Sequence, residues 1–180
     1  MGSAFWWIYI QPLHRIIIAM TALVILWAAV KYLAGKRRWW RAFNGAVFLG
    51  ITGVILYMTV FARGENPQPA ALMPFSTFAE AKIQPELYRA MLMNIFLFEP
   101  IGLSLPNVLP KKAHPVAVTV VFALLLSIGI EISQFYFHLG RCETDDVIMN
   151  TLGAAIGSAA YGLVKWHTGR DNQHHSSDFK

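Results

Sequence analysis

The sequence predicts an all-α fold, a polytopic transmembrane bundle with about five spanning helices and a short extracellular interfacial segment. Of its 180 residues, 56% are hydrophobic and only 14% are charged, whereas about one-quarter of an ordinary soluble domain is charged. The charged residues are also segregated, which leaves long stretches with almost none. About 20 apolar helical residues span the core of a bilayer, so these stretches decide the fold class.

Five apolar stretches are long enough to be spans, and residues 1–167 read as one transmembrane domain. The strong positive charge near the N-terminus follows the first apolar run, which favours a retained helix over a cleaved signal peptide. The third stretch is the weakest, because it contains Asn94, Glu99 and Pro100. Residues 168–180 are polar and predict a disordered cytoplasmic tail. The expected spans are residues 13–33, 43–62, 87–105, 116–139 and 147–166.

The segment between the second and third spans has a different composition. Residues 63–86 contain several prolines among mixed charges, which is typical of a loop. A short interfacial helix is expected at Phe75–Lys82, with Ser76 or Thr77 as its N-cap.

The Lys and Arg content of the short loops predicts the orientation of the chain. In Arg63–Glu86 the basic and acidic residues balance each other. The loop between the fourth and fifth spans is acidic apart from Arg141, and basic residues follow the last span. Cytoplasmic loops carry the excess of Lys and Arg, so we expect an outside N-terminus and a cytoplasmic C-terminus. Interfacial aromatic residues would then be Trp39, Trp40 and Trp166. The basic loops without acids contain Lys36, Arg37, Arg38 and Arg41, and Lys111 and Lys112.

Polar residues inside the spans are the candidate functional residues. A carboxylate in the hydrocarbon layer costs roughly 2.5–3.5 kcal/mol, so Glu131 must face protein or water and find a partner. Glu131 belongs to a stripe with Ser127, Gln134 and His138 on one helical face. In the expected topology the polar residues converge on the outer half of the membrane. The candidate binding residues are Arg63, Asn94, Glu131, Gln134, Arg141, Asp145, Asp146 and Asn150.

Structural roles are open alternatives for several of these residues. Asn94 and Gln134 could hydrogen-bond neighbouring helices. Asp145 and Asp146 could cap the last helix, whose N-terminus favours acidic residues. Arg141 could form a structural ion pair with either aspartate. On the same helix, Gly153 and Gly157 are spaced for close helix packing.

Several blocks of the sequence resemble the VanZ-like membrane protein family. They are Arg63 followed by Leu72-Met73-Pro74-Phe75, the run from Asn94 to Gly102, the run from Glu131 to Gln134, and the run from Gly140 to Gly153. Two positions depart from the family pattern: Glu99 replaces an apolar residue, and Glu143 replaces an aspartate. The family is named for a protein that lowers sensitivity to the glycopeptide teicoplanin, so the resemblance implies a role in the cell envelope.

Three classes of function fit these residues. The preferred one is binding of an amphiphile at the outer leaflet, such as a lipid-linked cell-wall precursor or a lipoglycopeptide, with arginines holding its phosphate or carboxylate. The alternative is an enzyme acting on a lipid headgroup, with Glu131 or Asp146 as acid/base or metal ligand. A transporter is disfavoured because no inverted repeat is visible. We expect membrane lipids as partners, but no cofactor, metal or nucleic acid.

The predicted orientation can be tested by cysteine accessibility. On a Cys142→Ser background, Thr144→Cys should react with a membrane-impermeant maleimide added to intact cells, and Lys36→Cys should react only after permeabilisation. Labelling of position 36 from outside the cell would overturn the orientation and place the polar layer on the cytoplasmic side.

Overall fold

A computed structural model describes the backbone of residues 11–34 and 39–177, and the side chains of residues 15–33 and 39–166. All regular elements in these ranges are helical, which confirms the predicted fold class. The elements in order are α2 (Gln11–Ala34), α3 (Trp39–Leu56), the π-helix η2 (Tyr57–Phe61), α4 (Ser76–Ala81), α5 (Glu86–Val108), the 3₁₀ turn η3 (Lys111–Ala113), α6 (Pro115–Tyr136) and α7 (Thr144–Ser177).

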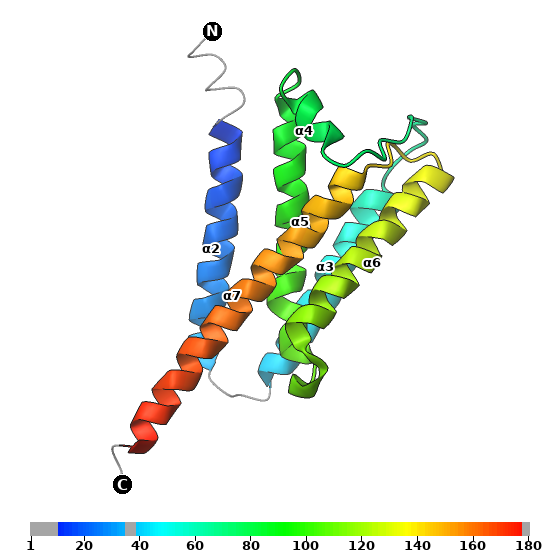
Figure 1. Cartoon of the computed structure of the whole chain (residues 1–180). Helices are drawn as coiled ribbons and strands as arrows, with labels where there is room; N and C mark the ends of the chain where they lie inside the picture. The colour runs from blue at the N-terminus through cyan, green and yellow to red at the C-terminus, as the bar shows by residue number, and fades with distance from the viewer. Residues whose placement is uncertain (1–10, 35–38, 178–180) are drawn as a thin grey trace.

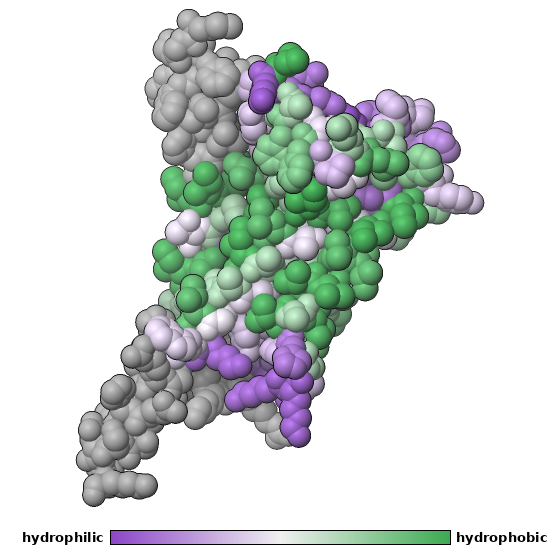
Figure 2. Space-filling model, viewed as in Figure 1, coloured by the Kyte–Doolittle hydropathy of each residue, from purple (hydrophilic) through white to green (hydrophobic). Residues whose placement is uncertain are grey.

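The described part of the chain contains five helices that are long and apolar enough to cross a membrane. Their apolar stretches run over Arg15–Leu33, Trp39–Phe61, Glu86–Val108, Pro115–Tyr136 and Thr144–Trp166. Figure 2 shows an apolar belt between two hydrophilic ends of the molecule. Many large apolar side chains on this belt are exposed, including Ile25 of α2 and Leu125 of α6. A surface of this kind is stable in lipid, so the chain is a multi-pass membrane protein.

Helix α5 lies at the centre of the bundle and packs against α2, α3, α6 and α7 (Figure 1). Its buried side chains Phe98 and Ile101 contact Ile55 of α3, Ile130 of α6 and Ala154 of α7 in the main hydrophobic cluster. Helix α4 lies at the end where α5 begins, and we call this the α4 end (Figure 1). The opposite end carries Arg41, Lys111 and Lys112, and we call it the basic end.

The two central helices, α5 and α7, approach each other until their backbones touch. A Cβ added to Gly153 would collide with the carbonyl oxygen of Ile95, and one added to Gly157 would collide with that of Glu99. A Cβ on Gly102 would meet the carbonyl of Ala154 in the same way. Small residues permit this approach, which replaces the hydrophobic driving force that is missing between helices in lipid.

Two prolines lie within α5 without ending it. Pro106 has no N–H to donate to the carbonyl of Gly102. The Ser158 hydroxyl of α7 donates to that carbonyl over 3.4 Å instead. Ser104 donates back to the carbonyl of Pro100 over 2.6 Å. The contact from the neighbouring helix therefore compensates for the backbone donor that Pro106 lacks, as is common in transmembrane helices.

Helix α6 ends at Tyr136, three residues earlier than the predicted span. His138 has a φ of 54°, and the N–H of Leu139 donates to the carbonyl of Gln134 over 2.9 Å. This left-handed residue and its hydrogen bond form a Schellman-type end. The prediction that His138 shares a helical face with Glu131 is therefore wrong. At the other terminus of the bundle, the backbone of α7 remains helical to Ser177, although composition predicts disorder from residue 168.

The α5–α7 contact leads to a stability prediction. Gly153→Ala should lower the free energy of unfolding by about 1–3 kcal/mol, because the added methyl group overlaps the backbone of Ile95. The control is Gly53→Ala, because Gly53 has no other atom within 4 Å of its added Cβ. That control should leave stability unchanged or slightly raised, since alanine favours a helix. Equal melting temperatures of the two detergent-solubilised variants would contradict the assignment.

Candidate functional site

The long loop after η2 lies against the connection between α6 and α7 at the α4 end. Ala71 and Glu143 form a parallel bridge, in which the N–H of Ala71 donates to Cys142 over 2.8 Å and the N–H of Thr144 donates to Ala71 over 3.1 Å. The N–H of Asn66 donates to the carbonyl of His138 over 2.7 Å. Two segments far apart in sequence are thus joined through their backbones.

Asp145 caps α4 from a distant part of the chain. Its carboxylate, which is 1% exposed, accepts the N–H of Phe75 over 2.5 Å and the N–H of Thr77 over 2.8 Å. The residue at the N-cap position is Phe75, whose φ is 64° and whose side chain cannot cap. The prediction that Ser76 or Thr77 caps this helix is therefore wrong, because a buried carboxylate already satisfies the free N–H groups.

Arg141 forms a two-pronged ion pair with Glu80 of α4. Both nitrogen–oxygen distances are 2.7 Å, and the Arg141 Nε lies 3.7 Å from Glu143 Oε1. The Arg141 hydrogen bond lowers the pKa of Glu80, and Glu80 in turn raises the pKa of Arg141. The side chain extends toward α4, so the structural ion pair that Arg141 forms is with Glu80 and not with either aspartate. We call Thr77, Glu80, Arg141, Glu143 and Asp145 the clamp.

Glu131 lies beneath the clamp and is 4% exposed. Its Oε2 accepts the backbone N–H of Glu143 over 2.7 Å. The neighbouring charged groups are Asp146, Glu143 and Arg63. The buried carboxyl group therefore has one backbone donor and one nearby cation.

The Cys142 thiol lies beside Glu131. Burial and the charge of Glu131 raise the pKa of this thiol, which keeps it protonated at neutral pH. Because the thiolate is the reactive form of cysteine, we assign Cys142 no chemical role.

Asp146, Asn94 and Arg63 complete a second group of polar residues. The Asn94 side chain of α5 lies beside the half-buried Asp146 carboxyl group of α7, and Arg63 is the nearby cation. Arg63 is exposed, and within the described side chains no carboxylate oxygen lies within 4.0 Å of its nitrogens. A Cβ added to Gly140 would lie 3.0 Å from Arg63 Nη1. We call Arg63, Asn94, Glu131 and Asp146 the polar site.

The two remaining candidates connect helices away from this site. Gln134 donates to the carbonyl of Thr59 over 3.2 Å, and Asn150 donates to the Ser127 hydroxyl over 2.8 Å. Thr59 lies in the last turn of η2, where carbonyl groups have no helical donor. Both amides therefore have the structural role that was an open alternative for Gln134, and the structure does not bring them to the polar site.

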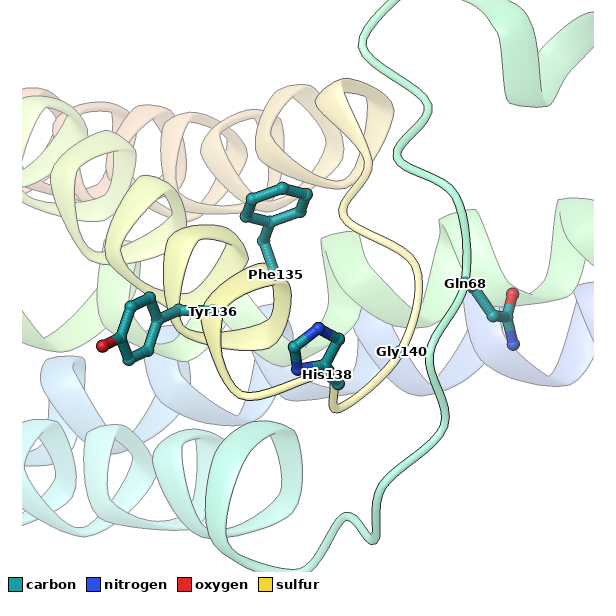
Figure 3. Close-up of a pocket in the computed structure, with 5 residues that line it drawn as sticks. All are labelled: Gln68, Phe135, Tyr136, His138 and Gly140. Atoms are coloured by element: carbon teal, nitrogen blue, oxygen red, sulfur yellow. The ribbon is translucent and has the colours of Figure 1, made fainter.

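A hollow of about 390 Å³ adjoins the polar site through Gly140. Figure 3 shows Phe135, Tyr136 and His138 at the end of α6, with Gln68 on the facing loop. The aromatic side chains around it are exposed at the membrane interface, where aromatic residues are enriched. The hollow places aromatic side chains beside Gly140, which lies near Arg63.

Sequence reasoning missed the part played by Glu80 and the buried state of Glu99. Glu80 could have been found only by noticing that α4 offers a carboxylate to a distant arginine. Glu99 is 1% exposed, and in the described part of the chain its Oε2 has no hydrogen-bond partner. The sequence analysis placed the polar residues of the spans in the outer half of the membrane, but Asn44, Ser104, Thr119 and Ser158 are buried away from the α4 end.

The clamp generates a prediction about loop dynamics. Glu80→Gln should increase amide hydrogen exchange over residues 71–82, because it removes the charged partner of Arg141. In the wild-type chain the pair should be lost as pH falls through the lowered pKa of Glu80, below the ordinary value of 4.5. Glu86→Gln, at an exposed position nearby, is the matched control. Equal exchange in both variants would show that the Glu80–Arg141 ion pair does not hold α4 and its loop in place.

Comparison with known proteins assigns the family. The family model described as VanZ/LLP1 matches residues 20–165. The "Protein VanZ" of Enterococcus faecium is 40% identical over 87 residues, which cover 44% of this chain and 48% of that protein. The chain thus spans about half the length of this curated relative in the matched region. No solved structure matches the chain.

The family match covers the three middle spanning helices in full, most of the first and last ones, and all residues of the polar site and the clamp. It agrees with the helical membrane fold and with the motifs that surround Arg63, Asn94, Glu131 and Asp146. The chain therefore belongs to the VanZ/LLP1 family.

Proposed function

We propose that this protein binds an amphiphilic, anionic ligand at the polar site and thereby lowers sensitivity to glycopeptides such as teicoplanin. The ligand would be a lipid-linked cell-wall precursor or a lipoglycopeptide. Its charged group would bind Arg63, and its apolar part would lie over the aromatic hollow. The α4 end would face the outside of the cell, as the loop charges predict.

The position of Arg63 carries this proposal. Its guanidinium lies near Gly140, which also lines the hollow, and its charge is close enough to act on Glu131 and Asp146. An exposed guanidinium with no close carboxylate has donors available for a phosphate or carboxylate of a ligand. Glu131 and Asp146 would orient the arginine, while Asn94 holds Asp146 in place.

The geometry favours binding over the enzymatic alternative. A general base must come within hydrogen-bond reach of the substrate atom whose proton it takes. Glu131 is 4% exposed, and one of its oxygens is held by the Glu143 amide. Among the described residues, no three His, Cys, Asp or Glu side chains are arranged to hold a metal ion. Asp146 is the better-placed candidate for catalysis, because it is only half-buried.

The assignment of Arg63 and Glu131 to the polar site can be tested in cells. Arg63→Gln and Glu131→Gln should return the teicoplanin sensitivity of an expressing strain to that of a strain without the protein. A charge-assisted hydrogen bond is worth about 1.5–3 kcal/mol, so loss of Arg63 should weaken ligand binding about tenfold or more. The measurements are the minimal inhibitory concentration and the amount of fluorescent teicoplanin retained by intact cells.

The controls separate a binding role from a folding role. Arg89→Gln and Glu65→Gln remove exposed charges of the same kinds at the α4 end and should leave sensitivity unchanged. Membrane levels and melting temperatures of all four variants should match the wild-type protein. Arg63→Gln with full protection and normal abundance would refute the proposal. A phenotype lost only together with protein abundance would assign the polar site to folding.

A further inference from the structure

We propose that the basic end of the bundle contains a second binding site, which holds the phosphodiester headgroup of an anionic phospholipid against Lys31. The site is formed by side chains of α2, α3 and α7, whose aromatic rings are neighbours at this end. It is separate from the polar site and shares no residue with it.

Three aromatic rings build the wall of this site. The ring of Trp27 lies 6.1 Å from that of Trp40 and 6.4 Å from that of Tyr161, between centroids. Lys31 Nζ lies 5.0 Å from the centre of the Trp40 ring, and Lys165 Nζ lies 5.8 Å from the centre of the Tyr161 ring. Two ammonium groups from different helices thus contact the same group of neighbouring aromatic rings.

Hydrogen bonds fix the two indole rings in place. The Trp40 N–H donates to Asn107 over 3.0 Å, and the Trp27 N–H donates to Asn44 over 3.4 Å. Asn44 itself donates to the carbonyl of Trp40 over 2.8 Å. Trp40 is 3% exposed, so the expectation that it is an interfacial belt residue is wrong. A buried ring with its N–H already satisfied serves as a rigid support for the Lys31 ammonium.

Among the described side chains, the Lys31 ammonium has no carboxylate partner. It is half-buried, and among the described residues no carboxylate oxygen lies within 4.0 Å of it. The sequence has no Asp or Glu before Glu65, none between Glu99 and Glu131, and none in residues 147–170. A cation–π contact does not use the hydrogen-bonding capacity of an ammonium group, which has three N–H donors.

The depth of Lys31 identifies the kind of anion. Lys31 lies in the last turn of α2, and Lys165 lies at the end of the apolar stretch Thr144–Trp166. Lysines at such positions extend to the headgroup layer, where phosphate groups of lipids lie. Basic pockets between transmembrane helices on the cytoplasmic side are typical sites for anionic headgroups. Arg41, which donates to the carbonyl of Val108 at the same end, adds positive potential.

Lipid binding to the purified full-length chain tests the site. Native mass spectrometry of the detergent-solubilised protein should show one phosphatidylglycerol retained at a lower lipid concentration than phosphatidylcholine. Lys31→Gln should weaken the retention of phosphatidylglycerol about fivefold, the effect of one lysine near a lipid surface. Lys31→Arg should preserve it, because the charge remains.

Two controls decide the specificity and the source of the phosphate. Lys112→Gln removes an exposed charge from the same end and should not change lipid retention. Inorganic phosphate should not displace phosphatidylglycerol at equal concentration. Equal retention of both lipids by the wild-type chain, or equal weakening by Lys112→Gln and Lys31→Gln, would overturn the proposal. Displacement by inorganic phosphate would overturn the lipid assignment and identify a site for free phosphate.

Discussion

The backbone contact between α5 and α7 is the constraint on which the rest of the structure depends. Gly153 and Gly157 let α7 lie directly on α5, and every other spanning helix packs around this pair. The contact brings Asn94 of α5 to Asp146 of α7. Because α6 reaches α7 through a short connection, Glu131 is held close to the same aspartate. Close packing in the apolar layer thus positions the polar site at its edge.

A polar residue inside a membrane protein needs a hydrogen-bonding or charged partner, and most polar residues at the α4 end have one. Arg141 and Asp145 are used to fasten α4 and its loop to the start of α7. Gln134 and Asn150 connect helices. The proposed ligand site consists of what these contacts leave: an exposed guanidinium, two carboxyl groups and an amide. A binding residue differs from a structural one because it keeps hydrogen-bonding groups or charge near the membrane surface that no protein group uses.

The sequence predicted the number of spans, because apolar length is a local property. Of the eight candidate binding residues, four lie in the polar site, whereas Gln134, Asn150, Arg141 and Asp145 make structural contacts instead. The sequence could not predict pairings between distant segments, such as the capping of α4 by Asp145. The sequence also shows no sign that Ser104 and Thr119 are buried. Each hydroxyl group donates to the carbonyl four residues earlier, so burial needs no polar partner on another helix that a sequence pattern could reveal. Trp40 looked interfacial by position, and only the packing of α2 against α3 shows that its ring is buried.

Gly140 shows how the clamp and the polar site depend on each other. Its φ of 149° is unfavourable for any side chain, and a Cβ there would press on Arg63. The Schellman-type end of α6 lies just before this glycine, and η2 ends at Phe61, two residues before Arg63. π-Helical turns are frequent at functional sites, where they change the direction of the following residues. Arg63 and Gly140 therefore lie close together, where the segment after η2 meets the connection between α6 and α7.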